Sequence, residues 1–410
     1  MSLISVAGLF LIFAFAVILL SKEQLFNSTR NIVVSTSLLI AALMLRLYCF
    51  EYKTLDYIDF LHPWINYFRE NGGFYALRNS IGNYNVPYLY FLALFSYFPE
   101  NDWLYLIKLL SVFFEVVLAY ASMMLVSLSC PSENRKLLAF FAVLFLPTVL
   151  LNGSVWGQCD VILGAFSVLA LYLALEDRPI ASMICFAAAF AVKLQAVFIL
   201  PIIAVLWYRG KFKLWHGFIF PAAYVVIVMP AVLMGRPFWD TITLYLNQTS
   251  SIGNGLNYNS SSVFAFFPNE SNIEFWSTVG IICAVDFMLV VLIWLYIERR
   301  HVNYNIILAA ALLLSIGIPF LLPHMHDRYF FIADALALCF GIVFPKLCFI
   351  PVLVQFASLL GYHAYLKMRY LMPMKNGAIA LIIAMSVLIA FIIYQLPERQ
   401  QQNHKDTKKV

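Results

Sequence analysis

Long apolar segments recur along the whole chain, and they decide which class of fold the chain can adopt. A helix that crosses a bilayer needs about 20 predominantly apolar residues. Hydrophobic residues make up 63% of the 410 residues and charged residues only 11%, whereas a soluble domain carries about 25% charged residues. Because no water-soluble fold can bury so much apolar surface, the sequence predicts an all-α, polytopic bundle of transmembrane helices.

Eleven apolar segments have close to the length that one crossing requires. They are residues 2–20, 32–50, 104–128, 137–152, 159–176, 215–234, 276–297, 304–322, 329–345, 347–366 and 376–395. Residues 180–208 are too long for one span and are interrupted at Lys193, so we expect two short helices that meet there. Residues 88–98, between Pro87 and Pro99, are too short to span and are interpreted as re-entrant. The total is about thirteen spans.

Positive charge in the loops orients these spans. Short cytoplasmic loops are enriched in Lys and Arg, and with these spans one side receives 15 such residues and the other 8. We assign the richer side to the cytoplasm, which puts the N-terminus outside and a basic tail, residues 396–410, inside. Residues 1–395 are then expected to form a single transmembrane domain with two large external loops, residues 51–86 and 235–275.

The first external loop combines a predicted surface helix with two acids. In the segment DYIDFLHPWINYF, aromatic residues recur at helical spacing, which indicates a helix lying along the membrane surface. Asp56 and Asp59 stand at its start, where free backbone N–H groups favour an ionised carboxylate. Either acid alone could simply cap the helix. Either would also suit a general base, and the ring of Trp64 would suit the face of a sugar.

Further polar side chains fall at helix ends on the same predicted side. They are Trp156, Gln158 and Asp160 in SVWGQCD, Lys193 and Gln195 in KLQAVFILP, and His326, Asp327, Arg328 and Tyr329 in PHMHDRYFF. Each alone has a structural explanation, such as capping or interhelical pairing, but all of them fall on one face. Arg328 and Lys193 suit a phosphate, because guanidinium binds it bidentately and ammonium acts as a point charge.

Two other acids, Glu115 and Asp286, stand in the middle of predicted spans. They do not fit the same cluster. We expect both to be buried and to pair with polar neighbours, although a proton or ion path would also use such residues.

The ordered set of motifs resembles a known family. DYIDFLHPW, GGFYAL, NYNVPYLY, SVWGQCD, KLQAVFILP and PHMHDRYFF, which extend over roughly Thr54 to Ala333, are similar to bacterial membrane proteins related to the GPI-anchor mannosyltransferases. Those proteins have the glycosyltransferase C-type (GT-C) fold. The resemblance implies a transferase of the bacterial cytoplasmic membrane that passes a sugar from a polyprenyl-phosphate carrier to an acceptor outside. It also implies an essential acid in the first external loop, and Asp56 matches that place best, with Asp59 as the alternative.

Two positions depart from the pattern of that family. Asn83 stands where relatives often carry Asp, which weakens any role for a second acid there, although Asn83 stays a candidate for binding the donor. Asp327 stands where Glu is commoner in the family. The first difference bears on the chemistry of the site, and the second is mild.

The leading hypothesis is therefore a membrane hexosyltransferase with its active site facing outside. In it, Asp56 activates the acceptor hydroxyl, and Arg328 and Lys193 hold the phosphate of the polyprenyl-phosphate donor. The rings that would frame the sugar are those of Trp64, Trp156 and Tyr329. The acceptor would be a glycan, a glycolipid or a protein. The alternatives are a transporter or flippase of a lipid-linked saccharide, which would be expected to have an internal repeat and broken helices, and a polymerase or ligase of surface glycans.

No cofactor and no nucleic-acid partner is predicted. Some GT-C enzymes bind a divalent cation, and the pair Asp56 and Asp59 could do so, but we predict no metal site. His324 and His326 would point apart on a regular helix and make poor joint ligands. The basic residues are dispersed among loops, without the stripe that nucleic acid requires. The Asn- and Ser-rich residues 247–262 form a mobile loop in this hypothesis, which could order over bound substrate.

Overall fold

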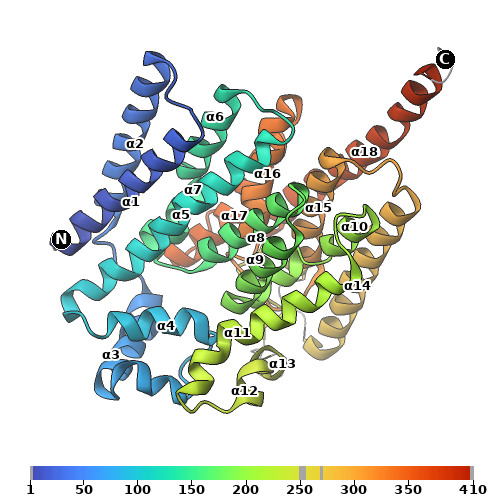
Figure 1. Ribbon diagram of the computed structural model, residues 1–410. Coiled ribbons are helices and arrows are strands. Elements are labelled where there is room, and N and C mark those ends of the chain that lie inside the picture. Colours follow the sequence, from blue (N-terminus) through green and yellow to red (C-terminus); the bar gives the residue numbers. More distant parts are fainter. Residues whose placement is uncertain (1–2, 249–254, 268–270, 407–410) are drawn as a thin grey trace. The chain divides into compact units, whose positions relative to one another are not determined.

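Helices account for nearly all of the regular structure (Figure 1). The computed structural model describes residues 3–248, 255–267 and 271–406. Among these residues, eight helices are long and apolar enough to cross a membrane. They are α1 (Leu3–Lys22), α2 (Thr29–Cys49), α5 (Trp103–Ser127), α11 (Ile219–Leu233) together with the five residues before it, α14 (Ile273–Ile297), α15 (Tyr304–Leu321), α17 (Phe349–Leu366) and α18 (Lys375–Asp406), of which Lys375–Leu396 is the candidate span. The prediction of an all-α, multi-pass bundle is confirmed.

Turn residues cut several other apolar runs into shorter helices. The run predicted as residues 137–152 is divided at Pro147 into α6 (Glu133–Leu144) and α7 (Pro147–Leu150) with the π-helix η4 (Leu151–Trp156), and the two parts are bent by 44°. Proline disfavours helical backbone in the residue before it. If the bent pair is one span, the described residues contain up to nine. The total of about thirteen stays a prediction.

The remaining helices are too short to cross alone. Residues 180–208 form two short helices as predicted, α9 (Pro179–Val192) and α10 (Ile202–Tyr208), separated by the 3-10 helix η5 (Leu194–Phe198) directly after Lys193. The others are α4 (Val86–Phe95), α8 (Asp160–Leu175), α12 (Phe238–Ile242), α13 (Leu244–Gln248), α16 (Phe331–Val343) and the 3-10 helix η8 (Val263–Phe266). The 3-10 helices η3 (Glu100–Asp102), η6 (Leu214–Phe218) and η9 (Pro345–Leu347) begin the candidate spans that continue as α5, α11 and α17. Helix α4 has ten residues, which are too few to cross a bilayer. Its re-entrant course stays a prediction.

Contacts divide the chain into two compact units. Unit 1 consists of residues 1–172, 180–196 and 218–252, and unit 2 of residues 173–179, 197–217 and 253–410. In unit 1, α5 packs against α1, α6 and η4. In unit 2, α15 packs against α14, α16 and α18, and α17 packs against α16 and α18.

The segment between α2 and α4 in unit 1 contains the predicted helix. It begins as a π-helix, η1 (Tyr57–Leu61), continues as α3 (His62–Glu70) and is followed by the 3-10 helix η2 (Gly73–Arg78). The face formed by Tyr57, Leu61, Ile65 and Phe68 is buried, which is the three- or four-residue spacing of an amphipathic helix. Asp56 precedes this helix, and its side chain makes no capping hydrogen bond.

Unit 2 contains one departure from the all-helical pattern. Strands β1 (Asn257–Tyr258) and β2 (Met325–His326) pair in parallel, with Tyr258 opposite His326. This small sheet joins the segment between α13 and α14 to the segment that contains PHMHDRYFF. The described part of the predicted mobile loop is therefore packed, with Ser260, Ser261 and Ser262 buried, and its residues 249–254 lie outside the described residues.

The two mid-span acids have different surroundings. Glu115 is fully buried on α5, and its Oε2 lies 2.6 Å from Nη2 of the equally buried Arg46 on α2. Its Oε1 accepts a hydrogen bond of 2.9 Å from the hydroxyl of Ser154. The predicted pairing is thus confirmed for Glu115. For Asp286 the expectation of burial is wrong, because its side chain is exposed on α14.

The Arg46–Glu115 pair gives a testable stability prediction. Removing one partner of a buried ion pair leaves the other charge without compensation, which costs about 3–5 kcal/mol. We expect Arg46→Met to lower the melting temperature of the purified protein in detergent, and the double variant Arg46→Met/Glu115→Gln to recover most of the loss. Equal melting temperatures for Arg46→Met and the wild type would show that the pair does not stabilise unit 1.

Candidate active site

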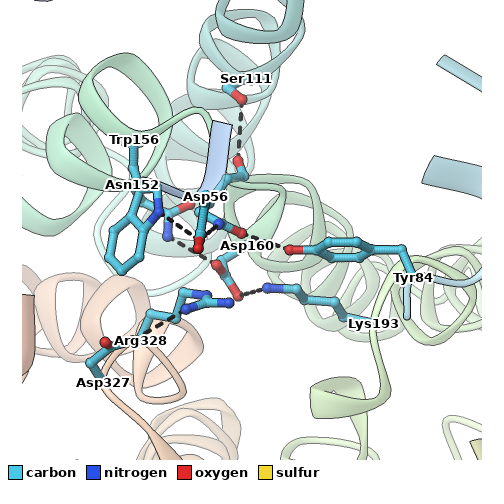
Figure 2. Close-up of polar contacts among 10 residues, drawn as sticks. Asp56, Tyr84, Ser111, Asn152, Trp156, Asp160, Lys193, Asp327 and Arg328 are labelled. Carbon is cyan, nitrogen blue, oxygen red and sulfur yellow. Dashed lines mark hydrogen bonds and ion pairs between the residues drawn. The ribbon is translucent and has the colours of Figure 1, made fainter. Parts of the chain in front are cut away.

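The carboxylate of Asp56 accepts hydrogen bonds from two side chains about a hundred residues further along the chain. Its Oδ2 accepts one from the indole Nε1 of Trp156 at 2.8 Å, and a second, short one from Nε2 of Gln158 (Figure 2). All three residues belong to unit 1. Hydrogen bonds from neutral donors favour the ionised form of a carboxylate and fix its orientation. The carboxylate of Asp56 is therefore held in a fixed orientation by these two donors.

The local backbone explains how Trp156 and Gln158 reach this carboxylate. The π-helix η4 ends at Gly157, whose φ of +77° lies in the left-handed region that glycine tolerates best. A Cβ at this position would lie 3.2 Å from the side chain of Ile107. After the turn, the amide of Gln158 donates to the carbonyl of Asn152 at 2.9 Å. The turn thus presents the side chains on both sides of Gly157 to one acceptor.

Tyr84 orients the amide of Gln158. Its hydroxyl donates to Oε1 of Gln158 at 2.8 Å, so Nε2 is the atom that faces Asp56. Tyr84 is not among the residues predicted from the sequence, although the neighbouring Asn83, which is exposed, is one of them. A tyrosine in an aromatic-rich segment carries no sequence signal that distinguishes this role.

Lys193 makes a buried ion pair with Asp160. Its Nζ lies 2.6 Å from Oδ1 of Asp160, and both side chains are buried. Oδ2 of Asp160 accepts a hydrogen bond from Nδ2 of Asn152 at 3.0 Å, and the ammonium lies 5.6 Å from the centre of the Tyr84 ring. The charge that the sequence analysis assigned to a donor phosphate is thus compensated by a carboxylate of the chain itself.

Three further candidates of unit 1 are Trp64, Asp59 and Gln195. The ring of Trp64 packs edge-on against Tyr84, with centroids 5.6 Å apart. Asp59 is exposed and Gln195 is half-buried. Of the two acids named from the sequence, the structure brings Asp56 together with Trp156 and Gln158.

Unit 2 holds the candidates that follow α15. The imidazole of His326 stacks on Tyr258, with ring centroids 4.7 Å apart and planes inclined by 13°, and the ring of Tyr329 lies 5.2 Å from it. Nη1 of Arg328 lies 3.3 Å from Oδ1 of the buried Asp327. Tyr258 was not named from the sequence. Its contact depends on the parallel pairing of two-residue strands, which no local pattern predicts.

His324 adds contacts between the segment that contains β2 and the residues around β1 and at the start of α14. Its φ of +60° is unusual for a residue with a side chain. Its Nδ1 lies 2.7 Å from the carbonyl oxygen of Gly255, which can only accept, and its Nε2 lies 3.0 Å from the hydroxyl of Ser277. The ring of His324 is thus used in holding this loop.

Tyr57, the residue after Asp56, is not a candidate base at neutral pH. Burial raises the pKa of the neighbouring Tyr57 to about 12, so its hydroxyl stays protonated at neutral pH and does not compete as a base.

Within the described parts of the chain, no group of three or more His, Cys, Asp or Glu side chains is arranged to hold a metal ion.

Comparison with known proteins identifies the family of the chain. The model of glycosyltransferase family 87 matches residues 83–323, more than half of the chain. The matched range includes Trp156, Gln158 and Asp160, whereas Asp56 precedes it. Among curated proteins no sequence matches the chain significantly. The family is a membrane family of GT-C type related to mannosyltransferases, which confirms the resemblance found in the motifs. The chain belongs to glycosyltransferase family 87.

Proposed function

We propose that this glycosyltransferase moves a hexose from a polyprenyl-phosphate donor to an acceptor hydroxyl on the outer side of the cytoplasmic membrane, with Asp56 as general base. One observation carries the proposal. The carboxylate of Asp56 accepts hydrogen bonds from Trp156 and Gln158, and both donors belong to the segment that the family model matches. An oriented, ionised carboxylate is what removal of a hydroxyl proton requires.

The reaction follows from this geometry. The acceptor oxygen attacks the anomeric carbon of the donor sugar while its proton passes to the carboxylate of Asp56. The bond between the anomeric carbon and the carrier oxygen breaks, and its electron pair leaves with the polyprenyl phosphate. A glycoside and a polyprenyl phosphate result. Positioned proton transfer of this kind contributes about 10²–10⁴-fold to a rate.

We assign the carrier phosphate to Arg328 on the basis of charge. A guanidinium binds phosphate oxygens through parallel N–H groups, and it stays charged at any working pH. Both cations contact a carboxylate, but the ammonium of Lys193 lies 2.6 Å from Asp160, whereas Nη1 of Arg328 lies 3.3 Å from Asp327, so Lys193 is the weaker candidate. In this proposal Lys193 instead holds the Asp160 carboxylate beside the ring of Tyr84.

The membrane setting supports a lipid-linked donor. Eight described helices, or nine with the bent pair, have the length and composition of membrane spans, so a polyprenyl chain would share the bilayer with the protein. The outer side of the active site follows from the distribution of Lys and Arg over the loops. The hypothesis of a transporter or flippase is not favoured, because the family match indicates sugar transfer.

The role of Asp56 is tested by substitution with its amide. We expect Asp56→Asn to lower kcat for sugar release from a synthetic polyprenyl-phosphate hexose about 100-fold or more, because the amide cannot accept the proton. The exposed Asp59 provides the comparison, and Asp59→Asn should stay within about twofold of the wild type. If both variants turn over like the wild type, Asp56 is not the base. If only Asp59→Asn is inactive, the base is Asp59.

The role of Arg328 is tested by the split between kcat and KM. Charge-assisted hydrogen bonds contribute about 1.5–3 kcal/mol, so Arg328→Gln should raise KM for the donor about tenfold or more. The matched control is Arg300→Gln, which alters an exposed arginine of the same unit and should leave KM unchanged. An unchanged KM in Arg328→Gln would remove this residue from the phosphate site.

The orientation can be tested by labelling intact cells. In a background without the seven native cysteines, a cysteine replacing the exposed Asp59 should react with a membrane-impermeant maleimide from outside. A cysteine replacing Arg300, on the predicted cytoplasmic side, should react only after the cells are opened. The reverse pattern would place the Asp56 segment inside the cell.

A further inference from the structure

Three buried polar residues form a line on one side of α5, in a span that is mostly apolar. Lys108, Ser111 and Glu115 are at most 2% exposed, and spacings of three and four residues bring them to one face of a helix. We call these residues the α5 polar face. Burial of such groups is costly unless they are hydrogen-bonded, so what each of them contacts is informative.

Lys108 holds the chain that leads to Asp56. Its Nζ donates to the carbonyl oxygen of Cys49 at 2.9 Å and to that of Tyr52 at 2.7 Å. These carbonyls belong to the last residue of α2 and to the segment that connects α2 with Asp56. The ammonium group therefore fixes the point from which the Asp56 segment starts.

Ser111 and Glu115 hold the segment that carries the two donors. The hydroxyl of Ser111 lies 3.1 Å from the carbonyl oxygen of Gln158 (Figure 2) and 3.2 Å from that of Ile107 on its own helix, and its one proton is shared between these two acceptors. Oε1 of Glu115 accepts from the hydroxyl of Ser154 at 2.9 Å. A Cβ on the neighbouring Gly153 would lie 2.2 Å from the same Oε1, so η4 packs directly on this carboxylate.

The two segments are also linked to each other. The hydroxyl of Thr54 donates to the carbonyl oxygen of Trp156 at 3.3 Å, and it accepts from the amide of Tyr57 at 3.4 Å. The α5 polar face thus contacts two segments: the one that leads to the acceptor Asp56, and the one that carries its donors Trp156 and Gln158. The hydrogen bonds of Lys108, Ser111 and Glu115 given for the described residues go to other groups and not to Asp56.

We propose that the α5 polar face is a positioning element for the reaction, which sets the distance between the Asp56 carboxylate and its donors Trp156 and Gln158. The proposal rests on the proposed function of Asp56. Lys108, Ser111 and Glu115 do not touch the reacting atoms. They act through the backbone of the two segments, and they determine how strongly the ionised carboxylate is stabilised.

The sign of the effect on pH dependence follows. A donor hydrogen bond stabilises the ionised carboxylate over the protonated one. If the backbone of Gln158 loses its anchor and the amide moves away, the carboxylate binds its proton more readily. The acidic limb of the rate profile then moves to higher pH, and kcat at neutral pH falls.

Ser111→Ala tests this with the smallest change, because it removes one oxygen atom. We expect kcat with a synthetic polyprenyl-phosphate hexose to fall about tenfold, with donor KM unchanged and the acidic limb of the profile displaced to higher pH. Ser111→Thr, which keeps the hydroxyl, should restore most of both. The matched control is Ser127→Ala on the same helix, whose hydroxyl bonds only within the helix at 2.7 Å and whose loss should change neither.

A second readout separates this proposal from the proposed function. With tryptophan labelled at the indole nitrogen, the resonance of Trp156, assigned by its loss in Trp156→Phe, should follow one pH transition that Asp56→Asn abolishes. In Ser111→Ala this transition should lie at higher pH. An identical transition in wild type, Ser111→Ala and Ser127→Ala would overturn the positioning role even if the protein transfers sugar. Only the proposed function is refuted if the wild type releases no sugar while the Trp156 transition still lies at higher pH in Ser111→Ala than in the wild type.

Discussion

The constraint on which the rest of the structure depends is that polar groups inside an apolar bundle must find partners within the protein. Unit 1 meets this constraint with a few chains of contacts. Arg46 and Glu115 compensate each other, Lys193 and Asp160 do the same, and Asp56 accepts from Trp156 and Gln158. Because these partners come from distant segments, satisfying them also assembles the candidate active site.

Much of the fold was predictable because it depends on local properties. Length and hydropathy alone located the helices that became α1, α2, α5, α14 and α15. The interruption of an apolar run by Lys193 predicted the break between α9 and α10. The number of crossings was less accessible, because Pro147 and Pro345 divide or end apolar runs whose composition alone suggests full spans.

The site was predictable in its members and much less in its contacts. Asp56, Trp156, Gln158 and Asp160 were named from their motifs, but which of them pair depends on tertiary packing. Lys193 was interpreted as a phosphate ligand because a lone cation gives no sign that its partner is Asp160, 33 residues away. Tyr84, Asn152, Ser111 and Tyr258 were missed for the same reason, since a hydroxyl or amide is common and its partner is remote.

The division of labour along the chain gives the family match a physical meaning. The matched residues 83–323 supply the donors Trp156 and Gln158 and the ion pair of Asp160, while the acid that they hold lies in the loop before them.

The central claim is that Asp56 takes the proton of the acceptor, and chemical rescue tests it most directly. In Asp56→Ala, which leaves room at the carboxylate position, added formate should restore sugar transfer in proportion to its concentration, and should have no effect on the wild type. Full activity of Asp56→Ala without formate would contradict the claim.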